Sequence, residues 1–181
     1  QGVARFKWSR DNAAFAVRVT AVGDDRKTLT LASLGRDQAT ALRAGDLVEI
    51  SDDTSELGPA RGHLTNLVAD PDPDQFTVIL AEALPADVGV GSAPAGPTSP
   101  PTSRPASPTP LVSAHLVLRR WDGQGMANAV FSETATPDMN LGDGVHVQFG
   151  GSDLRSGDYW QFTARSADGS IEALTDAPPM G

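Results

Sequence analysis

The sequence lacks several features that point to particular chemistries. It has no cysteine, which excludes disulfide frameworks and thiolate metal sites. No apolar run approaches the roughly 20 residues of a membrane-spanning helix, so no membrane span is expected. Lys and Arg (14) are outnumbered by Asp and Glu (23), which gives a formal net charge of −9. Because such a surface repels phosphate backbones, we expect no nucleic-acid partner.

Recognisable catalytic motifs are also missing. The chain contains neither a phosphate-binding P-loop pattern nor a G-x-S-x-G nucleophile elbow. His63, His115 and His146 stand far apart, at spacings that match no local metal-binding pattern. A hydrolase that uses scattered carboxylates ranks last among the hypotheses, because the sequence reveals no pairing of carboxylates. We therefore expect a non-enzymatic protein with no catalytic residue.

Turn formers and alternating apolar residues are plentiful. The 18 glycines and 14 prolines predict many turns. Period-2 alternation predicts short antiparallel strands, and the fold class is therefore expected to be all-β. Strands are expected within residues 3–9, 15–22, 27–34, 45–50, 62–80, 114–122, 142–151 and 157–174, and one helical turn within 36–45. The last of these stretches is expected to be a hairpin with its turn at "ADGS". The side chains expected to face inward are Phe15, Val17, Val19, Ala21, Leu29, Leu31, Val145, Val147, Phe149, Trp160 and Phe162.

A Pro-rich segment interrupts the alternation. Residues 91–110 hold seven prolines among Ser, Thr and Ala, a composition that supports neither a helix nor a central strand. We interpret it as a linker or long loop. The expected organisation is two small barrel- or sandwich-like units, residues 1–90 and 111–181, joined by this segment. A single domain with the segment as an excursion is the alternative.

One phrase occurs twice in the chain. "LRAGDLVEI" (Leu42–Ile50) and "LRSGDYWQF" (Leu154–Phe162) both place Gly-Asp before an apolar alternation. Glycine accepts backbone conformations that other residues avoid, and an aspartate side chain bonds readily to nearby backbone. The repetition thus predicts two structural corners that start strands, and not a repeated active site.

Two acidic loops offer oxygen ligands for calcium, which takes several oxygens from one flexible loop. The first contains Asp70, Asp72 and Asp74; the second contains Asp138, Asn140 and Asp143. The first loop departs from the EF-hand pattern, which needs Gly and Glu where this chain has Gln75 and Ala81. We therefore expect both loops to be turns, and a calcium site is the secondary interpretation of each. No other cofactor is expected.

Aromatic residues are the remaining candidates for ligand binding. Trp8, Trp121, Tyr159 and Trp160 could form a platform on which a sugar ring stacks. The chain has only ten aromatic residues, so core packing is the competing interpretation for each. If these side chains form such a platform, the expected partner is a glycan.

Several blocks carry a family resemblance. "FKWSRDN", "GDLVEI" and "LRSGDYW", in this order, resemble the middle region of a large uncharacterised bacterial domain-of-unknown-function family. The resemblance implies phage-tail-like systems, protein partners in a larger assembly, and an extracellular particle or the cell surface as location. It supplies no catalytic residues. Because family members are longer and the chain opens at Gln1, we expect a fragment of a longer protein.

Two function hypotheses follow from the sequence. The first is a non-enzymatic structural or adaptor module of a phage-tail-like or cell-surface assembly. The alternative is a carbohydrate-binding module that uses exposed Trp and Tyr side chains, with calcium as its ion.

Overall fold

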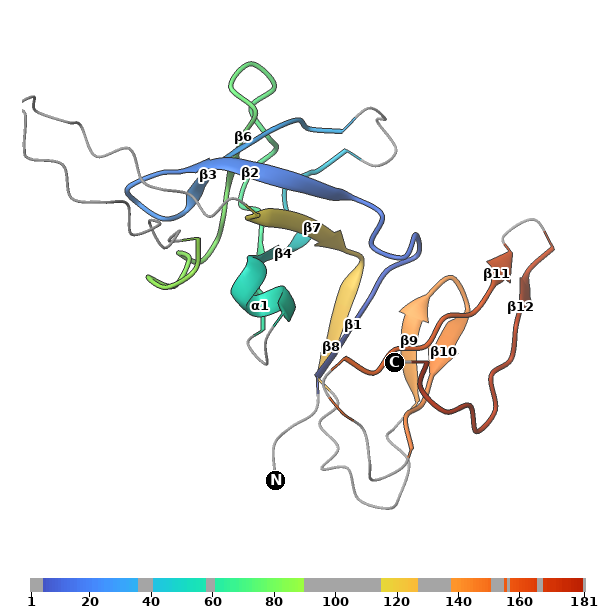
Figure 1. Cartoon of the computed structure of the whole chain (residues 1–181). Coiled ribbons are helices and arrows are strands. Elements are labelled where there is room, and N and C mark those ends of the chain that lie inside the picture. The colour runs from blue at the N-terminus through green and yellow to red at the C-terminus, as the bar shows by residue number, and fades with distance from the viewer. Residues whose placement is uncertain are drawn as a thin grey trace, which may run out of the picture. The chain divides into compact units, whose positions relative to one another are not determined.

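The computed structural model describes residues 5–35, 41–57, 61–89, 115–126, 138–150, 155, 157–165 and 168–180. It is nearly all β, as predicted, with one short helix (Figure 1). The Pro-rich segment 91–110 lies outside the described residues. The strands of the larger sheet are β2 (Ala16–Val22), β3 (Thr28–Leu31), β4 (Leu47–Ser51), β5 (His63–Asn66), β6 (Thr77–Ile79) and β7 (Val117–Trp121). The remaining strands are β1 (Arg5–Trp8), β8 (Gly123–Met126), β9 (Met139–Gly142), β10 (Val145–Val147), β11 (Ala164–Arg165) and β12 (Ser170–Ile171).

The chain divides into two compact units. One comprises residues 8–122, and the other comprises residues 1–7 together with 123–181. These bounds differ from the expected 1–90 and 111–181, because β7 follows the Pro-rich segment yet pairs with β2 and β4. The sequence shows β7 as a strand but does not show which strands it joins.

The larger unit contains a six-stranded sheet in the order β5-β4-β7-β2-β3-β6, in which every neighbouring pair is antiparallel. The sheet curls into a half-barrel, and a bridge between Leu67 and Leu80 joins its two edges. Beside this bridge, the Val68 N–H donates to the Ile79 carbonyl at 3.0 Å. Because each edge pairs with the other there, fewer backbone groups at this end are left for water or a partner chain.

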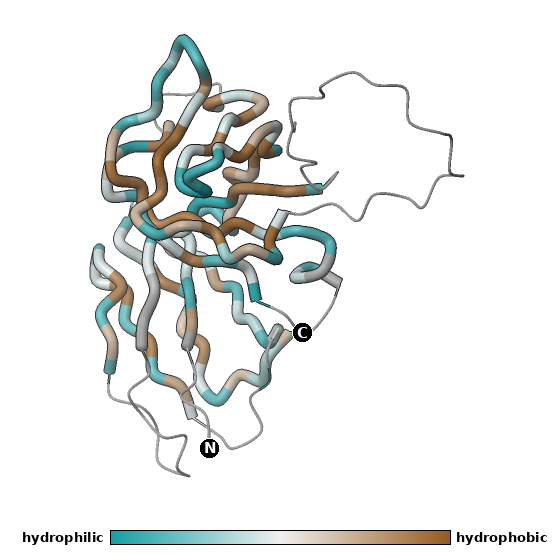
Figure 2. The backbone as a smooth tube through the Cα atoms, turned by 90° about the vertical axis from the view of Figure 1, so that its left-hand side faces the viewer, coloured by the Kyte–Doolittle hydropathy of each residue, from teal (hydrophilic) through white to brown (hydrophobic). Residues whose placement is uncertain are grey.

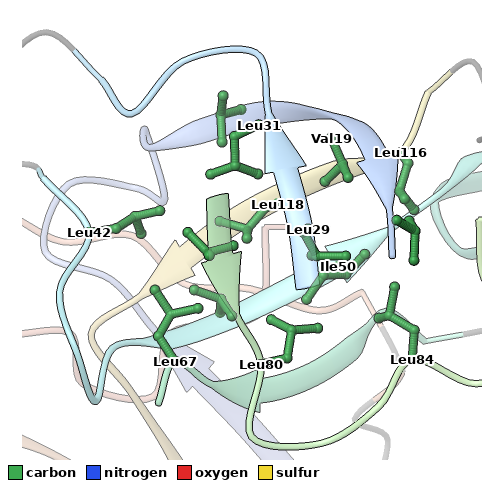
Figure 3. Packing of buried hydrophobic residues seen from close by; sticks show 14 of the residues in the cluster. Val19, Leu29, Leu31, Leu42, Ile50, Leu67, Leu80, Leu84, Leu116 and Leu118 are labelled. Atoms are coloured by element: carbon green, nitrogen blue, oxygen red, sulfur yellow. The ribbon is translucent and has the colours of Figure 1, made fainter. Parts of the chain in front are cut away.

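The core of this unit lies inside the curled sheet. Leucine, isoleucine and valine side chains from the strands and adjoining loops meet there (Figure 3). Hydrophobic stretches alternate with hydrophilic ones along the backbone (Figure 2). The side chains with at most 2% of their surface exposed are Val19, Leu29, Leu31, Val48, Ile50, Leu67, Val78, Leu80, Leu116 and Leu118.

The expected inward face of β2 needs one correction. Phe15, Val17 and Val19 are buried as predicted, but Ala21 is exposed and Val22 is buried in its place. The pairing of β2 with β3 shifts register between Val19 and Ala21. Such a bulge adds one residue to the strand and moves the later side chains to the opposite face. Strict alternation read from the sequence therefore fails after Val19.

Strand β4 is buried along its whole length, on both faces of the sheet. Val48 and Ile50 point into the core, whereas Glu49 lies on the other face with only 8% of its surface exposed. The Trp121 indole N–H donates to Glu49 Oε2 at 2.9 Å. A Cβ atom built at Gly62 would lie 2.6 Å from the Glu49 side chain, so Glu49 fills the space that Gly62 leaves. Strand β7 is likewise covered on both faces to differing degrees, since Leu118 is buried and Val117 is half-buried.

Helix α1 (Asp53–Leu57) was not expected from the sequence. Asp52 caps it: Asp52 Oδ1 accepts the Ser55 N–H at 3.0 Å, and Ser55 Oγ accepts the Asp52 N–H at 2.8 Å. This reciprocal pair has the arrangement of a capping box, with Ser55 in the place that Glu or Gln usually takes. Residues 41–45 form no helix, while 36–40 of the expected helical turn lie outside the described residues. None of the helices within the described ranges has the length and apolar character needed to cross a membrane.

The smaller unit contains the two-stranded sheets β1-β8, β10-β9 and β11-β12, apart from Trp8 at the end of β1, which belongs to the larger unit. The predicted hairpin near the C-terminus is confirmed, since β11 pairs with β12 around Gly169, whose φ is +68°. Val145, Val147 and Phe149 are half-buried, and His146 and Gln148 are exposed, as the alternation predicts. The Phe149 ring lies between Phe6 and Trp160, with centroid distances of 5.0 and 5.5 Å.

Candidate functional site

The first Gly-Asp phrase forms a tight turn before β4. Gly45 has φ +88°, in the left-handed region that favours glycine. Asp46 Oδ2 accepts the Arg43 N–H at 2.9 Å, and the Asp46 N–H donates to the Arg43 carbonyl at 3.1 Å. Both the side chain and the backbone of this aspartate therefore fold the chain back before the strand begins.

The second phrase has the same geometry. Gly157 has φ +104°. Asp158 Oδ2 accepts the Arg155 N–H at 2.7 Å, and the Asp158 N–H donates to the Arg155 carbonyl at 3.2 Å. Residues 158–163 after this turn belong to no strand, and Trp160 and Phe162 among them are half-buried. Both phrases thus form the predicted corners, but only the first starts a strand, β4.

These turns predict the effect of replacing their glycines. A Cβ atom at Gly45 or at Gly157 would meet nothing within 4 Å, so only the positive φ opposes a side chain there. Gly45→Ala and Gly157→Ala should each reduce the free energy of unfolding of their own unit by about 1 kcal/mol. Urea denaturation measures this. Gly150→Ala is the matched control, because Gly150 also has open space but no positive φ; a loss equal to that of the turn variants would contradict the account.

Other acidic side chains fold the backbone in the same way. Each accepts at least one backbone N–H at 2.7–3.1 Å. The pairs of acceptor and donor residues are Asp25 with Lys27 and Thr28, Asp52 with Ser55, Asp70 with Ala44, Asp72 with Asp74 and Gln75, Asp122 with Arg10, and Asp168 with Ser170. These carboxylates act as turn and cap formers, a role that aspartate fills readily.

Two of these hydrogen-bonded carboxyls have altered acidity. The backbone N–H of Thr28 lowers the pKa of Asp25, with smaller contributions from the Lys27 N–H and the Thr28 hydroxyl. The Ser170 hydroxyl and N–H lower the pKa of Asp168. In both cases the cause is hydrogen bonding to the ionised form.

The lowered pKa of Asp25 predicts a dependence of stability on pH. A folded pKa below the unfolded value of about 3.9 adds stability above that value, and this stability is lost as the pH falls through the folded pKa. The stability advantage of the wild type over Asp25→Asn should therefore shrink as the pH is lowered below about 4. Denaturation at a series of pH values tests this. Asp24→Asn removes a carboxyl from the same turn that has no hydrogen bond within the described residues; a matching pH effect there would refute the assignment.

The structure places the first predicted calcium loop between β5 and β6. Asp70 Oδ1 accepts the Ala44 N–H at 2.8 Å. Asp72 Oδ1 accepts the N–H groups of Asp74 and Gln75, and Asp74 is exposed. At least two of the three carboxylates thus have structural roles in the loop.

The second predicted calcium loop belongs to the β9–β10 hairpin. Asn140 Oδ1 accepts the Gly142 N–H at 2.7 Å, and Asp143 has φ +49° at the turn. Asp138 Oδ2 lies 2.7 Å from His146 Nδ1, a contact that the sequence did not suggest. In the part of the chain that the structure describes, no group of three or more His, Cys, Asp or Glu residues is arranged to hold a metal ion. The calcium hypothesis stays a prediction.

The four aromatic candidates do not form one group. Trp8 and Trp121 belong to the larger unit, where both are half-buried. The Arg10 guanidinium lies 5.5 Å from the Trp8 ring centroid, and the Trp121 indole donates to Glu49. These contacts are typical of packing residues.

Tyr159 and Trp160 belong to the smaller unit. Trp160 packs on Phe149, and its indole N–H donates to the Ala177 carbonyl at 2.9 Å. Tyr159 has 53% of its surface exposed, and its carbonyl accepts the Met180 N–H at 3.0 Å. Of the four predicted aromatics, Tyr159 is therefore the one with a mainly exposed side chain. The role of these residues in sugar binding stays a prediction.

One surface feature was missed at the sequence level. Val68, Phe76 and Ile79 expose 55, 45 and 42% of their surfaces, all on the segment that joins the edges of the half-barrel. The signal was present in "TVIL", because consecutive apolar residues in a strand place one of them on the outer face. Since Val78 and Leu80 fill the core, Ile79 points outward.

Comparison with protein families identifies the family of the chain. A model described as a family of unknown function (DUF6519) matches residues 1–179. The chain belongs to this family. The DUF6519 match spans both compact units, so the family comprises the two together. Comparisons with curated proteins and with solved structures gave no match.

Proposed function

We propose that this DUF6519 chain is a non-enzymatic structural or adaptor module of a larger bacterial assembly, of the phage-tail-like or cell-surface kind. The observation that supports the proposal is that acidic side chains of the chain accept hydrogen bonds from its own backbone. The two Gly-Asp corners, the helix cap at Asp52 and the turn at Asp25 all direct carboxylate oxygens to backbone N–H groups. Side chains that shape the backbone in this way support a scaffold role.

The blocks "FKWSRDN", "GDLVEI" and "LRSGDYW" add to this proposal. Their resemblance to a family linked with phage-tail-like systems suggests the kind of assembly. The structure supports a scaffold role for the Gly-Asp of the latter two blocks, since it forms the two corners. Protein partners within the assembly are the expected ligands.

Isolation of the native assembly tests the proposal. The full-length gene product would carry an affinity tag at its own locus, and particles would be purified by density gradient and imaged by electron microscopy. We expect the chain at a fixed ratio to the other particle proteins, in a resolved position. If the chain were absent from every purified particle and remained a free monomer, the proposal would fail.

A carbohydrate-binding module is the second candidate, and the exposed ring of Tyr159 favours it. Its carbonyl is bonded to the Met180 N–H, so the backbone below the ring is fixed. A glycan array with the full chain, read in calcium and in EDTA, tests this function. A glycan whose binding is lost in Tyr159→Ala and kept in Met180→Ala would support it; an array without bound glycan would dispose of it.

A further inference from the structure

The hairpin that runs from β5 to β6 carries three exposed apolar side chains. The Val68 N–H donates to the Ile79 carbonyl at 3.0 Å, so these two residues lie opposite each other across the edge-to-edge contact. Their neighbours in sequence, Leu67 and Leu80, are buried in the core. Phe76 lies in the same hairpin, directly before β6, and its ring is exposed as well. We call Val68, Phe76 and Ile79 the hairpin patch.

The backbone at Phe76 is unusual. Its φ is +55°, in the left-handed region that bulky side chains rarely adopt. Glycine or asparagine would suit this conformation better, and core packing does not explain the phenylalanine, since 45% of its surface is exposed. A strained residue that presents an exposed aromatic ring is a sign of a functional surface.

The loop that carries this ring is held in place. Asp72 Oδ1 accepts the N–H groups of Asp74 and Gln75 at 2.8 and 3.1 Å, and the Asp72 N–H donates to the Thr77 carbonyl at 2.9 Å. The Phe76 carbonyl accepts the Leu31 N–H at 2.8 Å. Because the backbone on both sides of Phe76 is fixed, this segment has little backbone entropy left to lose on binding.

The loop also carries negative charge. Asp70, Asp72 and Asp74 lie between Val68 and Phe76, and no Lys or Arg occurs between Arg61 and Arg104. The loop rises at the top of Figure 1 and has a hydrophilic tip in Figure 2. A second copy of the chain would bring the same carboxylates face to face, which disfavours self-association through this surface. A partner with Lys or Arg around an apolar centre complements it.

We propose that the hairpin patch, with Asp70, Asp72 and Asp74 at its rim, is the docking surface for a protein partner whose contact region combines apolar side chains with Lys and Arg. The inference rests on the proposed function, because it names the surface through which the module would join its assembly. The aromatic ring anchors the contact, and the acidic rim selects the partner by charge.

A peptide library tests the proposal with a defined probe. The full chain would be immobilised and exposed to random 12-residue peptides displayed on phage, and the enriched peptides synthesised. We expect enriched peptides to combine apolar residues with Lys or Arg. In Phe76→Asn their affinity should fall at least about tenfold, because the ring is lost. Asparagine tolerates the positive φ, so this variant should unfold at the same denaturant concentration as the wild type or higher.

Three further variants sharpen the test. Val68→Thr preserves the shape and β-branching of the side chain and should weaken binding. Asp74→Asn should weaken binding less and reduce its dependence on salt concentration. Ile171→Thr changes an exposed apolar residue of the other unit and should leave affinity unchanged.

Other outcomes overturn the proposal. Enriched peptides that are acidic, peptides that bind Phe76→Asn as tightly as the wild type, or no enriched peptide at all would each do so. A dimer of the full chain that dissociates in Phe76→Asn would show that a second copy occupies the patch. None of these results bears on whether the chain is found in purified particles, so failure of the docking surface and failure of the proposed function are distinguishable.

Discussion

A fragment of residues 1–90 is expected to show no cooperative unfolding transition, because it lacks the strand between β2 and β4. Strand β7 pairs with β2 over three residue positions and with β4 over five. It also supplies Leu118, and Leu116 precedes it; both are fully buried. Without β7 the half-barrel would be open at its centre, with two unpaired strand edges and an exposed core.

The matching fragment of residues 8–122 should fold. It contains all six strands of the sheet and the whole core. Urea denaturation followed by circular dichroism should give one sigmoidal transition for 8–122 and a gradual, featureless change for 1–90. Cooperative unfolding of 1–90 alone would mean that β7 is not an integral part of this unit.

Replacement of Ile50 by alanine should strongly destabilise the larger unit. Ile50 is fully buried in β4, with Leu118 beside it on β7. Removal of three buried carbon atoms from a central strand should reduce the free energy of unfolding by about 2–5 kcal/mol. Chemical denaturation measures the loss.

Ile79→Ala is the matched control for this substitution. Ile79 also lies in a strand of the same sheet, but 42% of its surface is exposed. The expected loss is about 1 kcal/mol or less, because little buried area is removed. Equal losses in the two variants would show that the sides of β4 and β6 that face the core have been assigned incorrectly.

Local patterns predicted much of the fold. Alternation identified the inward residues of β3 and β10, and the Gly-Asp phrases predicted the turns that the structure shows. These features depend on residues that are near one another in sequence, where side-chain period and turn chemistry decide the outcome. The same reasoning missed α1, although the capping signal around Asp52 was present in the sequence.

Long-range pairing could not be predicted in the same way. Nothing in "LVLRRW" states that β7 inserts between strands near residues 16–22 and 47–51, because many antiparallel pairings satisfy the same apolar pattern. The bulge after Val19 likewise depends on the partner strand. The division at the Pro-rich segment followed from composition, which carries no information about strand order.

The candidate surface depended on exposure, which a single sequence reveals poorly. Trp121 was a candidate ligand residue by type, yet its indole N–H bonds to the buried Glu49. Phe76 was not singled out in the sequence, and its positive φ and exposed ring became visible only in three dimensions. Tyr159 is the candidate whose predicted exposure the structure supports.

Amide hydrogen exchange at Arg43 and Arg155 tests most directly the claim that both Gly-Asp aspartates serve the backbone. In the wild type each of these N–H groups donates to an aspartate carboxylate. Asp46→Ala should accelerate exchange at Arg43 about tenfold or more, and Asp158→Ala should do the same at Arg155, with each fold retained. Unchanged exchange at both amides, or two variants that instead lose a shared bound ion, would contradict the account.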